Sequence, residues 1–142
     1  MNFVLDASVT MCWLLSDGKP SANAYARQVL EAVTATDTQA VVPMIWGLEV
    51  ANVIAKAEAR GLITEAHSEA FLEMLGGIDI EVDSATFAKS LGDTLQLARR
   101  HHLSAYDASY LEVALREGLS LATLDDDLMK AAKKAGVKRF TA

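Results

Sequence analysis

The sequence has 142 residues, of which 51% are hydrophobic and 23% are charged, and its formal net charge is −6 at pH 7. This length suits one domain with a substantial core, so residues 1–142 are expected to form a single domain. The negative charge argues against broad, nonspecific attraction to nucleic acid, although a local basic surface or a metal-mediated contact remains compatible with it.

The start of the chain and its single cysteine bear on the cellular compartment. Met1-Asn2-Phe3 lacks the basic beginning of a signal peptide. The longest apolar stretch, residues 41–48, is far shorter than the ~20 residues that a membrane-spanning helix needs. The single cysteine, Cys12, cannot form an internal disulfide. These features predict a cytoplasmic protein without a membrane segment, in which Cys12 fills the core rather than acting as a reactive thiol.

The first predicted strand is the apolar run Phe3-Val4-Leu5, which ends at Asp6. A run this short, bounded by polar residues, indicates a buried central strand rather than a helix. Ligands bind at the carboxyl ends of strands in open α/β sheets, and Asp6 stands at such an end. Because an isolated buried carboxylate is costly, Asp6 is expected to be solvated, paired or bound to a metal ion.

Helices and one further strand follow in the first half of the chain. A helix is expected over 9–15, and a second helix, capped by Ser21, is expected to run to Val33. A connector over 34–39 and a strand over 40–42 follow. The next helix is expected over 43–60, with Pro43 in its first turn. The first half of this last helix is apolar nearly all round, and Glu49 and Asn52 interrupt it on one face.

The second half predicts the same alternation. Thr64 caps a helix that runs to Leu75, and the alternating residues 78–83 indicate a strand at or near a sheet edge. The helices that follow are expected to bury Phe87, Leu91, Leu95 and Ala98 after a Ser84 cap, then Ala108, Leu111 and Leu115 after Ser104, and finally Leu128, Ala131, Ala132 and Ala135. Strands are expected over 119–124 and, as a short final one, over 137–140.

This alternation predicts an α/β fold: a three-layer α/β/α sandwich with a central, mostly parallel sheet. Four acidic residues fall at one edge of that sheet. Asp6 and Asp125 follow strands, while Glu49 and Asp107 lie in early turns of helices. Carboxylates that are brought together repel one another, which raises their pKa values unless a cation is present.

Oxygen ligands of this kind suit Mg²⁺ or Mn²⁺, and the sequence has no Cys/His set with zinc spacing. One or two such ions can activate a water molecule and hold a phosphate oxygen, with ~3.5–4 Å between the ions in a two-metal site. The chemistry indicated is phosphodiester hydrolysis.

Four short motifs in this order resemble those of PIN-domain proteins, and specifically of VapC-type toxin ribonucleases from type II toxin–antitoxin pairs. The pieces that carry the resemblance are Val4-Leu5-Asp6-Ala7-Ser8, Glu49, Asp107-Ala108-Ser109-Tyr110-Leu111 and Leu121-Ala122-Thr123-Leu124-Asp125. Each piece alone is a weak signal, but their order covers nearly the whole chain, which makes the resemblance fairly specific.

The resemblance implies a Mg²⁺-dependent endoribonuclease, with Mn²⁺ as a substitute ion. Its catalytic and metal-binding residues would be Asp6, Glu49, Asp107 and Asp125, with Asp6 and Asp107 as the firmest ligands. Ser8 and Thr123 would support this pocket, Asp127 would add an outer carboxylate, and Asp126 is expected to face solvent. The implied partners are an RNA substrate such as tRNA or rRNA, a VapB-type antitoxin that crosses the cleft, and a second copy of the chain in a homodimer.

Other interpretations of these residues stay open. Asp6 can cap a helix, and Asp107 can simply complement a helix dipole, but four acids in this order favour a site. A receiver-type phospho-acceptor is disfavoured because its paired acids and late lysine do not fit this pattern. A PIN-fold interaction module that binds metal or a partner without catalysis remains the alternative function.

The basic and aromatic residues admit similar pairs of interpretations. His101 and His102 beside two arginines favour a helix-dipole role over catalysis. Five basic residues near the end of the chain can follow RNA phosphates, although a solvated face is the favoured interpretation. They are Lys130, Lys133, Lys134, Lys138 and Arg139. Trp13 and Trp46 are expected in the core or at a dimer surface rather than as platforms for bases.

Overall fold

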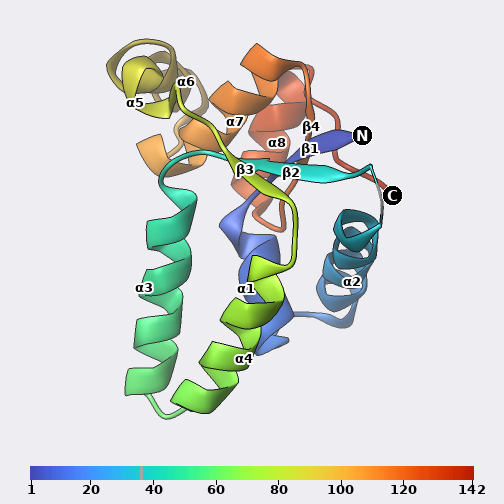
Figure 1. The fold of residues 1–142 in the computed structure, drawn as a ribbon. Helices are drawn as coiled ribbons and strands as arrows, with labels where there is room; N and C mark the ends of the chain where they lie inside the picture. The colour runs from blue at the N-terminus through green and yellow to red at the C-terminus, as the bar shows by residue number, and fades with distance from the viewer. Residues whose placement is uncertain (36) are drawn as a thin grey trace.

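The computed structural model describes residues 1–35 and 37–142. Thr36, within the predicted connector 34–39, lies outside the described residues. The described residues form a parallel sheet of β1 (Asn2–Leu5), β2 (Gln39–Val42), β3 (Ile80–Val82) and β4 (Ser120–Ala122), in the order β3-β2-β1-β4 (Figure 1). The predicted parallel sheet is therefore confirmed, and so is the edge position of the strand within residues 78–83.

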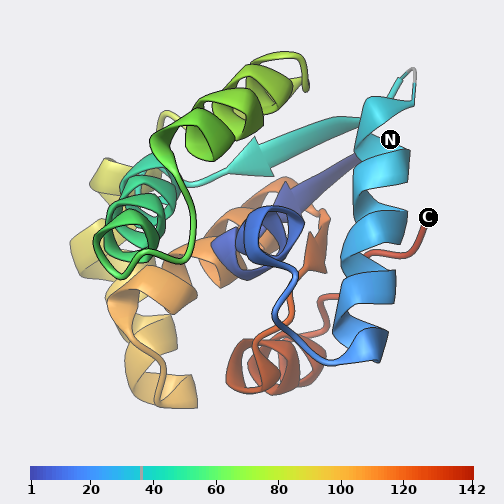
Figure 2. The same cartoon turned by 90° about the horizontal axis from the view of Figure 1, so that it is seen from below.

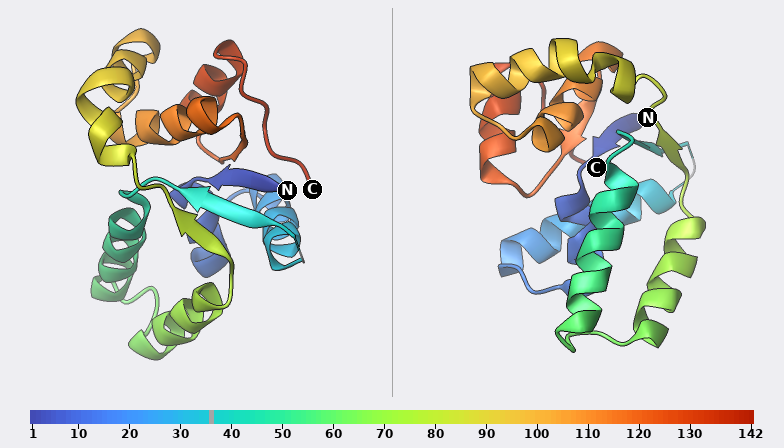
Figure 3. Two further views of the ribbon diagram at one scale, coloured as in Figure 1. Left: turned by 45° about the horizontal axis from the view of Figure 1, so that its top comes forward. Right: turned by 90° about the vertical axis from the view of Figure 1, so that its left-hand side faces the viewer.

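Helices cover both faces of this sheet. The chain contains α1 (Ala7–Leu15), α2 (Pro20–Thr34), α3 (Trp46–Ala59), α4 (Glu65–Gly76), α5 (Thr86–Lys89), a π-helical turn η1 (Ser90–Thr94), α6 (Leu95–His101), α7 (Ala105–Glu117) and α8 (Asp126–Lys134). Figure 1 and the left view of Figure 3 show α1 to α4 on one side of the sheet and α5 to α8 on the other. The three-layer α/β/α prediction is confirmed.

Alternating residues of β1 supply both halves of the core. Phe3 and Leu5 pack with α1 and α2, while Val4 packs with α7 and α8, and all three are fully buried. Successive side chains of a strand point to opposite faces, so a central parallel strand must be apolar on both. A third apolar cluster joins α1 to the α3–α4 pair, which Figure 2 shows beside α1. Trp13 and Trp46 pack against these clusters, and Cys12 is buried, as predicted.

The end of the chain closes the core without a full strand. The Phe140 ring stacks on Phe3 with 3.9 Å between ring centroids, and the Tyr25 hydroxyl donates to the Phe140 carbonyl at 2.8 Å. Only one bridge, between Leu121 and Arg139, joins this segment to the sheet. The strand predicted over 137–140 is therefore reduced to a single pairing.

The largest departure from the predicted pattern lies in residues 86–101. Phe87 and Leu91 are 81% and 88% exposed, although a 3.6-residue period placed them on a buried face. Thr86 and Thr94 are the buried residues here, and the π-helical turn η1 adds an extra residue that breaks the 3.6-residue period between α5 and α6. Ala85, rather than Ser84, precedes α5, and no side chain caps this helix.

Smaller departures concern other helices. Leu115 is 41% exposed rather than inward-facing. Helix α3 begins at Trp46, because Met44 and Ile45 form a turn before it and the Met44 N–H donates to the Thr86 hydroxyl. In the part of the chain that the structure describes, no helix is both long and apolar enough to cross a membrane.

Candidate active site

Asp6 lies where β1 and β4 end side by side. Its backbone N–H donates to the Ala122 carbonyl at 3.0 Å, and its side chain is only 4% exposed. The Ser8 hydroxyl donates to Asp6 Oδ2 at 2.6 Å, and the Thr123 hydroxyl donates to the same oxygen at 2.8 Å. Two hydroxyl groups thus fix the Asp6 carboxylate and direct their hydrogen bonds to one of its oxygens.

Burial raises the pKa of Asp6 to about 6, although the hydrogen bonds from Ser8 and Thr123 oppose this rise. The negative charges of Glu49 and Asp125 raise the pKa further. Burial disfavours a charged carboxylate, and nearby like charges add to the penalty. The surroundings of Asp6 thus favour its protonated form, and a bound cation would favour the charged carboxylate instead.

The loop after β4 uses the same hydroxyls to place Asp125. The Thr123 hydroxyl accepts a hydrogen bond from the Asp125 N–H at 3.0 Å, and the Ser8 hydroxyl accepts one from the Leu124 N–H at 3.0 Å. Asp125 Oδ1 accepts from the Leu128 N–H at 2.9 Å and so caps α8. Ser8 and Thr123 therefore connect the loop of Asp125 directly to Asp6.

Glu49 lies in the first turn of α3 and is held by a residue of α7. The hydroxyl of Tyr110, a fully buried residue, donates to Glu49 Oε1 at 2.5 Å. Burial raises the pKa of Glu49, the Tyr110 hydrogen bond lowers it, and the charge of Asp107 raises it again. Tyr110 received no functional role from the sequence, although it stands three residues after Asp107 and so on the same side of a helix.

Asp107 lies in the first turn of α7, where its N–H donates to the capping hydroxyl of Ser104 at 3.0 Å. Burial raises the pKa of Asp107 to about 6, and the charges of Asp125 and Asp6 raise it further. Asp127 contributes a smaller effect in the same direction. The structure thus gathers all the predicted acidic residues near enough to influence one another electrostatically.

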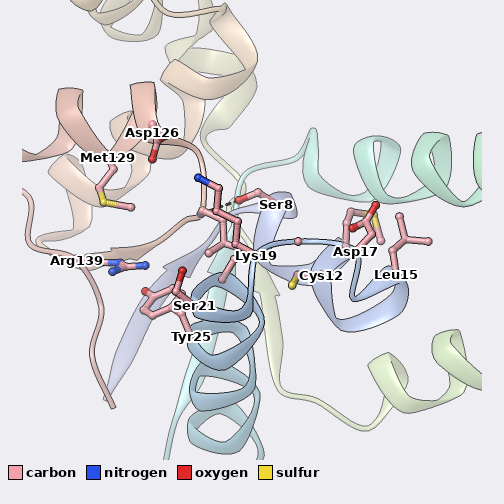
Figure 4. A pocket seen from close by; sticks show the side chains of 14 residues that line it. Ser8, Cys12, Leu15, Asp17, Lys19, Ser21, Tyr25, Asp126, Met129 and Arg139 are labelled. Carbon is pink, nitrogen blue, oxygen red and sulfur yellow. Dashed lines mark hydrogen bonds between the residues drawn. The ribbon is translucent and has the colours of Figure 1, made fainter.

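Asp126 points elsewhere, into a cavity of about 580 Å³ between α8, α1 and α2. Figure 4 shows Asp126 on the opposite side of this cavity from Tyr25 and Ser21, with Lys19 between them. The Arg139 guanidinium lies over the Tyr25 ring at 3.7 Å from its centroid. Asp126 is exposed, in agreement with its predicted solvent-facing position.

The acidic residues supply carboxylate oxygens, which are suitable ligands for a hard cation such as Mg²⁺. In this structure, however, their side chains are not arranged around a common metal position. Within residues 1–35 and 37–142, no group of three or more His, Cys, Asp and Glu side chains is arranged to hold a metal ion. Carboxylate oxygens are the ligands that Mg²⁺ and Mn²⁺ prefer. The mutual repulsion that raises the pKa values of Asp6 and Asp107 is also what a bound cation relieves.

A parallel α/β/α sandwich with buried acidic residues at the carboxyl ends of β1 and β4 defines the class of this protein. A family model described as the PIN domain matches residues 3–134. The chain belongs to the PIN-domain family, and the resemblance of its four motifs to that family is confirmed.

One curated relative and several solved structures are similar to the chain. Ribonuclease VapC3 of Pyrobaculum aerophilum is 36% identical over 80 residues, which are 56% of this chain and 61% of that protein. The match thus spans less than two thirds of the relative's length.

The structural similarity extends over nearly the whole chain. PAE2754 from Pyrobaculum aerophilum has a TM-score of 0.67 at 23% identity, covering 98% of this chain and 83% of that one. VapBC2 from Rickettsia felis, bound to a DNA fragment from their promoter, has a TM-score of 0.67 at 15% identity, with coverage of 99% and 98%. FitAcB from Neisseria gonorrhoeae has a TM-score of 0.60 at 20% identity, with coverage of 99% and 97%. These similarities establish the shared fold.

Proposed function

We propose that residues 1–142 form one PIN domain that acts as a Mg²⁺-dependent endoribonuclease, the toxin of a type II toxin–antitoxin pair. The observation that carries this proposal is the buried Asp6, whose pKa is raised by burial and by the charges of Glu49 and Asp125. A nuclease needs such a concentration of negative charge to recruit a divalent cation. The partial match to a protein named as a ribonuclease supports RNA as the substrate.

The residues proposed to hold Mg²⁺, or Mn²⁺ in its place, are Asp6, Glu49, Asp107 and Asp125. When bound, the cation supplies Lewis-acid activation of a water molecule and of a phosphate oxygen. Ser8 and Thr123 orient Asp6 through its Oδ2 oxygen, which leaves the Oδ1 oxygen for the cation. Tyr110 orients Glu49 in the same manner. Such supporting hydrogen bonds fix the direction in which a ligand presents its free oxygen.

We also propose a VapB-type antitoxin and a homodimer, acting in the cytoplasm on tRNA or rRNA. An apolar groove of about 690 Å³ between α3, α4 and β3 supports a protein partner. Its walls include Leu72 and Val82, which are 49% and 55% exposed. Phe87 and Leu91, both largely exposed, supply a second apolar surface for subunit contact. The solved structure of VapBC2 is one in which a related fold occurs with a partner.

The test of the proposed activity is cleavage of a mixed tRNA and rRNA pool by purified protein. We expect discrete fragments with Mg²⁺ or Mn²⁺ and none with EDTA, with activity restored when excess metal is added back. Folded, antitoxin-free protein that leaves the RNA intact with either ion would contradict the proposal and favour the non-catalytic interaction module.

A further inference from the structure

Cationic side chains from two separate helices line one cavity beside the acidic site. This cavity of about 510 Å³ lies between the end of α6 and the outer side of α8. Its walls include Arg100, His101, His102, Lys130, Lys134 and, as the carboxylate of the group, Asp127. Figure 2 and the left view of Figure 3 show the end of α6 next to α8, although the two helices are separated in sequence by the whole of α7.

The cations of this cavity have no ion-pair partner among the described residues. The ion pairs found there join Lys89 to Asp93 and Arg116 to three acidic residues, all of them away from the cavity. Arg100, Lys130 and Lys134 are exposed and face a single carboxylate. The whole chain has a net charge of −6, but the three unpaired cations around this cavity make the local surface charge positive.

The fold of α8 explains why these lysines share a side. Leu128, Ala131 and Ala132 are buried against the core, which leaves Asp127, Lys130 and Lys134 on the other side of the helix. The charge of Asp127 also contributes to the raised pKa of Asp107. Asp127, on the wall of the cationic cavity, is therefore close enough to influence Asp107 of the proposed site electrostatically.

We propose that this cavity binds backbone phosphates of the RNA that neighbour the cleaved bond, an inference that rests on the proposed ribonuclease function. Lysine and arginine are the usual partners of phosphate, and a volume near 500 Å³ falls within the usual range of ligand pockets, about 300–1,000 Å³. The cavity beside Ser8 is the weaker candidate, because Asp17 and Asp126 balance Lys19 and Arg139 there. An anion is thus favoured specifically between α6 and α8.

The experiment compares two double variants with the same change in charge. Lys130→Gln with Lys134→Gln removes two cations of the cavity, whereas Lys133→Gln with Lys138→Gln removes two that line a different cavity. Binding of a fluorescent single-stranded RNA is measured in EDTA at several salt concentrations. Cleavage of the same RNA is then measured with Mg²⁺, and thermal unfolding verifies that both variants are folded.

We expect the Lys130/Lys134 variant to lower the slope of log K against log salt by about 1.4, since each neutralised phosphate contributes about 0.7 for single strands. Its RNA affinity near 0.1 M salt should fall on the order of tenfold. Its KM should rise with little change in kcat, because a phosphate contact is made in the ground state and the transition state alike. The RNA affinity of the Lys133/Lys138 control should stay within about twofold of the wild-type value at the same salt concentration.

Arg100→Gln, on the opposite wall, provides an independent variant and should lower the salt slope by about half as much. Equal effects in both double variants, or no effect in either while the wild type cleaves RNA, would overturn the phosphate site and leave the ribonuclease proposal intact. A wild-type protein that neither binds nor cleaves RNA would overturn both proposals.

Discussion

The Tyr110 hydroxyl on α7 donates a hydrogen bond of 2.5 Å to Glu49 Oε1 at the start of α3. This contact joins residues that are 61 positions apart in the sequence and fixes one carboxylate of the candidate site. Buried tyrosines generally pair their hydroxyl with a partner in this way. In the proposed metal site, Tyr110 would therefore be a positioning residue that acts through Glu49.

The variant Tyr110→Phe tests this role. We expect its affinity for Mn²⁺ to fall about tenfold or more, as is usual when a hydrogen bond that orients a metal ligand is lost. Its free energy of unfolding should fall by about 1 kcal/mol. Calorimetric titration with Mn²⁺ measures the first change, and urea unfolding measures the second. Tyr106→Phe is the control, because Tyr106 lies on the same helix but is 61% exposed; equal losses in the two variants would exclude the positioning role.

The raised pKa of Asp6 predicts how stability depends on pH in the absence of divalent metal. A folded pKa of about 6 exceeds the unfolded value of about 4, so the folded protein binds more protons between these limits. Stability should therefore fall as pH rises through this window and level off above it. The loss between pH 5 and pH 7.5 should be roughly 1 kcal/mol from Asp6, with Asp107 acting in the same direction.

Urea unfolding in EDTA at both pH values measures this effect. Asp6→Asn should flatten the dependence by the contribution of one group, while millimolar Mg²⁺ should raise stability most at pH 7.5, where the carboxylates are charged. A protein that gains stability between pH 5 and pH 7.5 in EDTA would show that the acidic residues are not destabilised by their surroundings.

A second group of charged residues, centred on Arg116 of α7, was not predicted from the sequence. Arg116 contacts Asp83 Oδ2 and Glu112 Oε2, each at 2.8 Å, and both carboxylates are nearly buried. Burial would raise the pKa of Asp83, but the hydrogen bonds and charge of Arg116 hold it below its ordinary value.

Arg116→Ala should lower the free energy of unfolding by about 2–4 kcal/mol, because it leaves the buried carboxylates of Asp83 and Glu112 without their cation. Lys89→Ala is the matched comparison, since the Lys89–Asp93 pair is longer, at 3.7 Å, and exposed. That change should cost no more than about 0.5 kcal/mol. Similar losses in urea unfolding of the two variants would refute the structural role of Arg116.

The π-helical turn contains a buried hydroxyl without a hydrogen bond in the described part of the chain, that of Thr94. An unsatisfied buried hydroxyl costs about 1–3 kcal/mol, whereas valine has nearly the same shape without the polar group. Thr94→Val should therefore stabilise the protein by about 1 kcal/mol in thermal or urea unfolding. A destabilised Thr94→Val protein would show that the hydroxyl is paired in solution.

The parts of the fold that followed from sequence are those that local pattern determines. Phe3-Val4-Leu5 could be assigned to a central strand because both faces of a parallel sheet need apolar residues. The positions of Asp6 and Asp125 at strand ends followed at once from their strands. Whether these residues bind metal remains a proposal.

Other features depend on packing that no local pattern contains. Nothing in residues 86–101 distinguishes a π-helical turn from a continuous helix. The apolar spacing of Phe87 and Leu91 also predicted a buried face, and that prediction is wrong because both side chains are exposed. The Tyr110–Glu49 hydrogen bond and the cavity that Arg100 and Lys130 both line bring together distant segments of the chain. Such contacts arise only when α7 and α8 take their places on the sheet.

The most direct test of the central claim is cleavage of one defined RNA by single neutral variants of the acidic residues. With Mg²⁺, Asp6→Asn, Glu49→Gln, Asp107→Asn and Asp125→Asn should each lose at least ~100-fold in kcat/KM, because each is proposed to contact the ion that stabilises the transition state. Asp126→Asn, which removes the same charge from an exposed neighbour outside the cluster, should retain wild-type activity. Equal activity in the Asp6 and Asp126 variants, with both proteins folded, would contradict the account.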